Sequence, residues 1–317
     1  MPLTSAVVPS YNHGRFLPET IASVAAQVDV DVELVIVDDC STDDSAEIAA
    51  ELAASAPIPV RVFRNDHNSG VCATVNRAVR ESRGDLIALL GSDDRWHPTK
   101  LRAQLATVQN DPHVVATFAD MAMVDAAGDP LGSTFFDWVE RSWFPGVRGV
   151  ADERSGRLLR PLLRQGNFLP APTALIRRGA LDRVGPFDER LHHEDYDMWL
   201  RLSRIGRLAV DATPLADYRV LDGSLSARSG IGFLEDDVRS FARLARESPL
   251  LKPAIVWAAI RVLHRAYRDG YQRTPELESA VRDEFGRASG AILALARRSV
   301  GSSDAPRGPD ADPRITP

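Results

Sequence analysis

Two adjacent carboxylates, Asp93 and Asp94, follow an apolar run of strand length at residues 85–90. Carboxylates at the end of a buried strand are costly to keep there unless they have a partner. Hard divalent cations such as Mg²⁺ and Mn²⁺ favour carboxylate oxygens, and a bound cation can neutralise a diphosphate. The segment Gly91-Ser92-Asp93-Asp94 therefore predicts a site for Mg²⁺ or Mn²⁺ and a nucleotide-activated substrate. An acidic turn exposed to solvent is the alternative.

Polar clusters follow three other predicted strands, each at the point where the strand ends. The strands are predicted at residues 5–8, 33–37 and 60–64, and they are followed by Pro9-Ser10-Tyr11-Asn12, by Asp38-Asp39, and by residues 65–70 with Asn68 among them. In parallel sheets covered by helices, ligands bind at the carboxyl ends of the strands. Four clusters at one edge therefore predict a single binding site more strongly than any one of them does.

Short β-rich runs alternate with helical patterns in the part of the chain that must position these clusters. Helices are predicted at residues 17–27, 45–55, 71–82, 98–109, 178–184 and 194–204, and further strands at residues 114–118 and 171–176. Residues 95–98 are expected to end the fourth strand and to start a helix. The β-α-β-α order predicts an α/β fold, with a Rossmann-like, mainly parallel sheet and flanking helices.

The pattern becomes helical after residue 229, with helices predicted at residues 233–247, 253–269 and 275–298. We therefore expect three parts: residues 1–228 with the sheet, a C-terminal helical region at 229–300, and a disordered tail at 301–317 that is poor in apolar residues. One of these helices places Trp257 near Arg261 and Arg265, a pattern that could make a peripheral contact with a membrane surface. Packing on the first part of the chain or formation of a homodimer explains the same pattern and is preferred.

The composition is that of an ordinary soluble globular protein. The chain has 317 residues, 44% hydrophobic and 26% charged, and a formal net charge of −6, which argues against a broad nucleic-acid-binding surface. Its two cysteines do not make a disulfide framework, which favours a reducing compartment. No secretory signal and no apolar run of about 18–20 residues is visible, so we expect a cytoplasmic protein, with the inner membrane face as an alternative location.

Four motifs occur in order along the chain, and together they are specific. They are Val7-Val8-Pro9-Ser10-Tyr11-Asn12, Ile36-Val37-Asp38-Asp39-Cys40-Ser41-Thr42-Asp43, Gly84-Asp85 through Ser92-Asp93-Asp94, and His193-Glu194-Asp195-Tyr196-Asp197-Met198-Trp199-Leu200-Arg201-Leu202. In these motifs the chain resembles an inverting, family-2-type (GT2) glycosyltransferase with the GT-A nucleotide-sugar-binding fold. The resemblance covers roughly residues 4–228.

The resemblance implies a nucleotide-sugar donor at the four clusters, with UDP- or dTDP-sugars preferred over GDP-sugars. Tyr11 would stack on the base, and Asp38 and Asp39 would accept hydrogen bonds from a pyrimidine N–H or from ribose hydroxyls. A core tyrosine and helix-capping aspartates are the alternatives. The implied metal ligands are Asp93 and Asp94. The donor-binding residues that we expect are Pro9, Tyr11, Asp38, Asp39, Asn68 and Asp93.

The fourth motif is implied to supply the general base, Asp195, which would take a proton from the acceptor hydroxyl. Glu194, Trp199 and Thr173 are weaker candidates for the acceptor side, and Trp199 fits a core position at least as well. The aromatic segment 132–165 is interpreted as ordinary core or a packed loop, or else as a loop over the acceptor. The acceptor itself could be a glycan, a lipid-linked sugar or a small molecule.

Three positions depart from the pattern of the family. Gly91 stands where relatives often have an aspartate, Val75 where they often have a basic residue, and Leu221 where they commonly have a histidine that completes the metal site. These departures motivate a second hypothesis, a catalytically silent nucleotide-sugar-binding protein of the same fold. A dinucleotide-dependent oxidoreductase is set aside because no Gly-rich loop follows the first strand.

Overall fold

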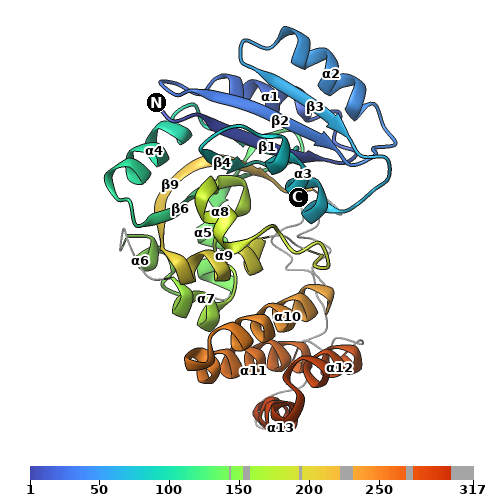
Figure 1. Ribbon diagram of the computed structural model, residues 1–317, viewed down its shortest axis with the longest axis vertical. Helices are drawn as coiled ribbons and strands as arrows, with labels where there is room; N and C mark the ends of the chain where they lie inside the picture. The colour runs from blue at the N-terminus through green and yellow to red at the C-terminus, as the bar shows by residue number, and fades with distance from the viewer. Residues whose placement is uncertain (143, 153–157, 193–194, 222–230, 269–273, 301–317) are drawn as a thin grey trace. The chain divides into compact units, whose positions relative to one another are not determined.

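The computed structural model describes residues 1–142, 144–152, 158–192, 195–221, 231–268 and 274–300 (Figure 1). The chain divides into two compact units, Met1–Ser224 and Leu225–Pro317. The expected disordered tail at 301–317, the expected boundary at 228/229 and the candidate Glu194 lie outside the described residues.

The first unit is built on one sheet, which has nine strands among the described residues, in the order β3-β2-β1-β4-β8-β6-β9-β5, with β7 paired to β6. The four strands predicted first are β1 (Thr4–Ser10), β2 (Val32–Asp38), β3 (Val60–Arg64) and β4 (Leu86–Leu89), and they pair in parallel. The other strands are β5 (Arg95–Trp96), β6 (Val114–Val124), β7 (Pro130–Thr134), β8 (Leu175–Arg177) and β9 (Arg207–Arg219). The predicted mainly parallel α/β sheet is confirmed.

Helices cover both faces of this sheet because its central strands are apolar on both sides. Every residue of β2 is buried. In Figure 1, α1 (Leu17–Ala25) and α3 (Val71–Glu81) lie on opposite faces of the sheet. Leu17, Ile21 and Val24 recur at helical spacing on α1 and join the core beneath β1, β2 and β4. The other helices of the unit are α2 (Ser45–Ser55), α4 (Lys100–Asn110), α5 (Phe135–Ser142), α6 (Val147–Asp152), α7 (Leu159–Gln165), α8 (Arg178–Val184) and α9 (Asp195–Ile205).

Three segments differ from the sequence prediction. Residues 95 and 96 do not start a helix but form β5, which pairs antiparallel with β9, and α4 begins only at Lys100. Segment 132–165 is more regular than expected, since its described residues contain part of β7 and the helices α5 to α7, and the burial of Phe136 and Phe144 agrees with the ordinary-core interpretation. Residues 171–173 form a 3₁₀ turn, so the strand predicted at 171–176 is reduced to β8. The clearest case is β5, which forms through its pairing with β9, a partner that local sequence does not reveal.

The second unit is helical, as predicted. Its helices are α10 (Ile231–Glu247), α11 (Lys252–Arg268), α12 (Thr274–Phe285) and α13 (Ser289–Val300). The helix predicted at 275–298 is divided in two by a 3₁₀ turn at Gly286–Ala288, where Gly286 has φ +50°. Among the described residues, no helix combines the length and the apolar content that a bilayer crossing requires.

Candidate active site

The carboxyl ends of β1, β2 and β4 meet at one edge of the sheet. Ser10 of β1 pairs with Asp38 of β2, and Val7 pairs with Leu89 at the end of β4. The Gly91–Asp94 turn therefore lies at the same edge as the loops after β1 and β2. The convergence that the strand ends predicted is present in the structure.

Asp38 carries an unused acceptor at this edge. Its side chain is 1% exposed, and its Oδ2 accepts a hydrogen bond from the Ser41 N–H at 3.0 Å and lies 3.3 Å from Arg64 Nε. Its Oδ1 is buried and has no hydrogen-bond partner among the residues that the structure describes. Because a buried acceptor without a donor is costly, Oδ1 is suited to an N–H or hydroxyl group of a ligand.

Asp39, in contrast, already accepts hydrogen bonds from the protein itself. Its carboxylate accepts hydrogen bonds from Asn65 Nδ2 at 2.7 Å, from the Ser69 N–H at 2.8 Å and from the Gly70 N–H at 2.9 Å. These bonds fix the loop after β3, in which Asn68 is exposed. The donor contacts expected of Asp39 and Asn68 stay predictions.

Two residues of unusual backbone geometry lie in the loops after β1 and β2. Asn12 and Cys40 have φ values of +56° and +61°, which side-chain-bearing residues rarely adopt. The Asn12 N–H donates to Ser41 Oγ at 2.9 Å, and Asn12 Oδ1 accepts from the Thr42 N–H at 2.8 Å. Tyr11, directly before Asn12, is 43% exposed and Pro9 is partly buried. The two loops thus hold each other in place and leave the Tyr11 ring accessible, as stacking on a base requires.

A side chain at position 91 would meet the carboxylates beside it. A Cβ atom at Gly91 would lie 2.7 Å from Asp94 Oδ2, closer than real Cβ contacts, and 3.0 Å from Asp93 Oδ1, so these carboxylates would have to shift. The Thr20 hydroxyl lies within hydrogen-bond distance of the carbonyls of Ser92 and Asp94, at 3.0 and 2.8 Å, and so anchors the turn.

The charged forms of the two carboxylates of this turn are disfavoured by their surroundings. Burial raises the pKa of the Asp93 carboxyl, although His13 and Arg219 offset part of the effect. Burial, and then repulsion from Asp93, raise the pKa of Asp94 well above its usual range. Side chains whose pKa is perturbed in this way mark sites where a cation or a proton is expected.

Arg219, which the sequence analysis did not single out, lies behind the turn. Its backbone N–H donates to Asp94 Oδ1 and its Nε–H donates to the Asp93 carbonyl, both at 2.9 Å. Its guanidinium also donates to the Ala126 carbonyl at 3.0 Å and to Glu19 Oε2 at 3.0 Å. The side chain is 2% exposed, so Arg219 supports the turn from within the protein. Its position at the end of β9 was not predicted, because β9 itself was not.

His13 is a second residue that sequence reasoning missed. Its ring lies at the front of the turn, with Nδ1 2.8 Å from Ser92 Oγ and 3.8 Å from Asp93 Oδ1. Its place directly after Pro9-Ser10-Tyr11-Asn12 was the available signal.

Asp93 and Asp94 fit a divalent cation that is shared with a substrate. Among the parts of the chain that the structure describes, no group of three His, Cys, Asp or Glu side chains is arranged to hold a metal ion. Mg²⁺, however, is commonly bound by one or two carboxylates together with waters and substrate phosphates. The buried Asp94 and the partly buried Asp93, both with raised pKa values, meet that description. Leu221 supplies no metal ligand, and residues 222–230 lie outside the described residues.

Asp195 begins α9 and is held by an amide. Asn167 Nδ2 donates to Asp195 Oδ2 at 2.7 Å, and Asn167 Oδ1 accepts from the Leu169 N–H at 3.2 Å, which fixes the orientation of the amide. Asp195 is partly exposed, so its carboxylate is accessible to a ligand. Asp197, in contrast, is buried in an ion pair with Arg201 Nε at 2.7 Å and has a structural role.

Two weaker candidates for the acceptor side are core residues. Trp199 is fully buried, with its ring edge-on to Phe118 at 4.6 Å and its Nε1–H donating to the Leu169 carbonyl. Thr173 is fully buried as well, and its hydroxyl bonds to the backbone of Ala119. Neither side chain presents a surface to an acceptor, which for Trp199 agrees with the core alternative.

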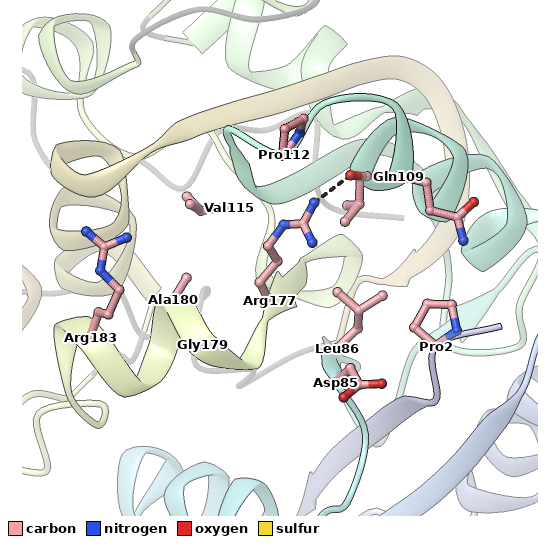
Figure 2. Close-up of a pocket in the computed structure, with 11 residues that line it drawn as sticks. Pro2, Asp85, Leu86, Gln109, Pro112, Val115, Arg177, Gly179, Ala180 and Arg183 are labelled. Carbon is pink, nitrogen blue, oxygen red and sulfur yellow. Dashed lines mark hydrogen bonds between the residues drawn. The ribbon is translucent and has the colours of Figure 1, made fainter.

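A pocket of about 330 Å³ lies at the other end of β4, away from these residues (Figure 2). It is lined by Asp85 and Leu86 at the start of β4 and by Arg177. Arg177 donates to the carbonyls of Val114 and Val108, and Arg178 donates to that of Gly84. The double arginine therefore ties strand ends together at the edge opposite the carboxylates.

Residues 5–185 match the model of the family described as Glycosyl transferase family 2. A Bacillus subtilis (strain 168) protein of teichuronic acid biosynthesis, the glycosyltransferase TuaG, is 28% identical over 187 residues, which cover 56% of this chain and 73% of that protein. The Escherichia coli glucosyltransferase WfaP, named for UDP-Glc and α-D-GlcNAc-diphosphoundecaprenol, is 26% identical over 83% of this chain and 91% of its own. In several further relatives the match spans only 34% to 65% of their length.

The fold is also that of a protein whose structure was solved with a nucleotide sugar. Staphylococcus aureus TarS (residues 1–349), crystallised with UDP-GlcNAc, superposes with a TM-score of 0.67 over 95% of this chain and 88% of that one. The sequence identity is 20%, so this likeness concerns the fold.

Proposed function

Because this chain belongs to glycosyl transferase family 2 and is a glycosyltransferase, we propose that it transfers a sugar from a nucleoside-diphosphate donor with inversion at the anomeric carbon. The observation that carries the proposal is that one unit holds two groups of carboxylates. Asp38, Asp93 and Asp94 lie at the carboxyl edge of the sheet, and the accessible Asp195 is separate from them. The first group suits a nucleoside diphosphate, and the second suits an acceptor hydroxyl.

For the donor, we propose a UDP- or dTDP-sugar. The buried Asp38 Oδ1 is an acceptor only, and it suits the ring N–H of a pyrimidine base. Exposed Tyr11 lies in the neighbouring loop and can stack on that base. TarS, a structural neighbour of this chain, was crystallised with UDP-GlcNAc, which supports the nucleotide class.

For the diphosphate, we propose that Asp93 and Asp94 hold Mg²⁺ or Mn²⁺. When bound, such an ion supplies a positive charge that stabilises the negative charge developing on the leaving diphosphate. The protein contributes the two carboxylates, whose raised pKa values favour a compensating cation, and a turn anchored by Thr20 and Arg219.

For the acceptor, we propose that Asp195 is the general base. The acceptor oxygen forms the new bond to the anomeric carbon, the bond from that carbon to the phosphate oxygen breaks, and the hydroxyl proton passes to Asp195. Asn167 holds one oxygen of the carboxylate and leaves the other for the acceptor. TuaG and WfaP are named for glycan and lipid-linked glycan synthesis, which supports a saccharide acceptor of that kind. Peripheral membrane contact and a homodimer stay predictions.

The direct test replaces Asp195 by Asn and measures sugar transfer and donor binding separately. We expect transfer to fall by at least about 10²-fold with unchanged donor affinity, since a positioned base contributes about 10²–10⁴-fold. Asp182→Asn, an exposed change on α8, is the matched control and is expected to retain full activity. Full turnover by Asp195→Asn would remove the base assignment.

The second candidate, a donor-binding protein without transferase activity, is motivated by Gly91 and Leu221. Slow hydrolysis of the donor in the absence of an acceptor discriminates between the two. We expect hydrolysis by the wild-type chain that stops on addition of EDTA. Tight donor binding with no hydrolysis and no transfer would favour the second candidate.

A further inference from the structure

His13 is held firmly at the front of the Gly91–Asp94 turn. Its backbone N–H donates to Ser45 Oγ at 3.0 Å, and its ring lies edge-on to Phe16 with the ring centres 5.8 Å apart. Its Nδ1 bonds to Ser92 Oγ at 2.8 Å. Contacts from three segments of the chain therefore fix both the position and the rotation of the imidazole.

The other ring nitrogen, Nε2, has no hydrogen-bond partner among the described residues, and the side chain is 31% exposed. When the Ser92 hydroxyl donates to Nδ1, the proton of the neutral ring lies on Nε2. The ring then presents one N–H group beside Asp93, whose Oδ1 is 3.8 Å from Nδ1.

This edge of the sheet needs such a donor because it is rich in negative charge. Asp38, Asp39, Asp93 and Asp94 all lie here, and a diphosphate adds further charge. Arg219, the buried cation of the turn, has its N–H groups on carbonyl oxygens and on Glu19. His13 has a ring nitrogen left over in the same place.

We propose that His13 donates its Nε2–H to a phosphate oxygen of the donor diphosphate and so binds the donor directly. This role rests on the proposed nucleoside-diphosphate donor. In this role Nε2 donates a hydrogen bond to the ligand, and the contact of Nδ1 with Ser92 orients the ring.

Two amide substitutions separate these nitrogens. Asn places its amide near the position of Nδ1 and keeps a partner for Ser92, but it has nothing at Nε2. Gln places its amide near the position of Nε2. We expect His13→Asn to weaken UDP binding, measured by calorimetry with Mn²⁺, by about tenfold or more, as the loss of a hydrogen bond to a charged group implies. His13→Gln is expected to bind UDP within about threefold of wild type.

Uridine, which lacks the diphosphate, is the second probe, and we expect all three proteins to bind it equally. Thermal unfolding of both variants establishes that they are folded. The role is overturned if His13→Asn binds UDP as wild type does, or if it loses uridine and UDP affinity in the same proportion. A wild-type chain that binds neither UDP, dTDP nor GDP overturns the proposed donor itself, and the role of His13 with it.

Discussion

Apart from Asp39, the buried carboxylates at the two edges of the sheet differ in how far the protein itself satisfies them. At the edge where β2 begins, Glu33 accepts from the Ser5 hydroxyl and the Arg83 N–H, both at 2.6 Å, and from Arg61 Nη2 at 2.9 Å. Burial alone would raise its pKa, but these three donors outweigh burial and lower it. At the edge where β4 ends, burial raises the pKa values of Asp93 and Asp94, and Asp38 Oδ1 has no hydrogen-bond partner in the described part of the chain.

The difference separates carboxylates that stabilise the sheet from carboxylates that are suited to bind a ligand. A buried carboxylate with a full set of donors stabilises the fold, whereas one without them is stable only when a ligand supplies the missing charge or proton. Arg177 and Arg178 at the first edge are bound to backbone carbonyls. The carboxyl edge therefore carries an electrostatic cost that a bound metal ion would relieve.

The largest effect that we expect is on activity at the carboxyl edge. Asp93→Asn should reduce kcat on the order of 10²-fold or more, because the metal ion that we propose it helps to hold would be worth several kcal/mol to the transition state. The equivalent change at the other edge, Glu33→Gln, should leave kcat within about twofold. Initial rates with saturating donor and Mn²⁺ provide the measurement. Equal losses in the two variants would break the comparison.

The second effect is on stability, and it should be larger at the opposite edge. Glu33→Gln directs an amide N–H₂ toward the Arg61 guanidinium and should lower the free energy of unfolding by about 2 kcal/mol at pH 7. Urea unfolding of the first unit measures it, and Asp182→Asn again serves as the control. An unchanged unfolding midpoint would mean that the Glu33 contacts add nothing to the fold.

The smallest effect is a dependence on pH that has opposite signs at the two edges. Asp94 has a raised pKa in the folded chain. Its stabilising contribution is therefore complete below pH 3.8, the usual pKa of the group, and is lost as the pH rises through the pKa of the folded state. Wild type should therefore gain stability relative to Asp94→Asn, on the order of 1 kcal/mol, when pH is lowered from 7 to 4 in EDTA.

Glu33 has a lowered pKa in the folded chain. Its contribution to stability is therefore complete above pH 4.5, the usual pKa of the group, and is lost as the pH falls through the pKa of the folded state. Wild type should therefore lose its advantage over Glu33→Gln as the medium is acidified below pH 4.5. Urea midpoints at a series of pH values measure both differences. Trends of the same sign would show that the two edges are not electrostatically distinct.

The clusters at the strand ends were predictable because strands and turns have local signatures. The apolar runs before Asp38 and Asp93 are recognisable without a structure, and parallel pairing then brings their ends to one edge. The nearby His13 could have been found in the same way. Arg219 could not, because its strand β9 is recognised as such only through its pairing with β6 and β5.

The fates of two weaker candidates show the same limit. Trp199 and Thr173 have residue types that suit a sugar pocket, yet both are fully buried, because α9 and the 3₁₀ turn at 171–173 pack them against β6. Residue type and spacing placed them near the site, but only packing determined which way they face.

By itself, the sequence determined the first four strands and the helices between them, the carboxylates at the strand ends and the family to which the chain belongs. Only the tertiary structure decided which of those carboxylates are satisfied, because their partners are distant along the chain: Asp39 meets Asn65, and Asp94 meets Arg219. A hydrogen bond or an ion pair depends on a few ångströms of separation, whereas a strand depends on a run of neighbouring residues. The local pattern therefore predicts where a site lies, and the fold decides which side chains in it are left for a ligand.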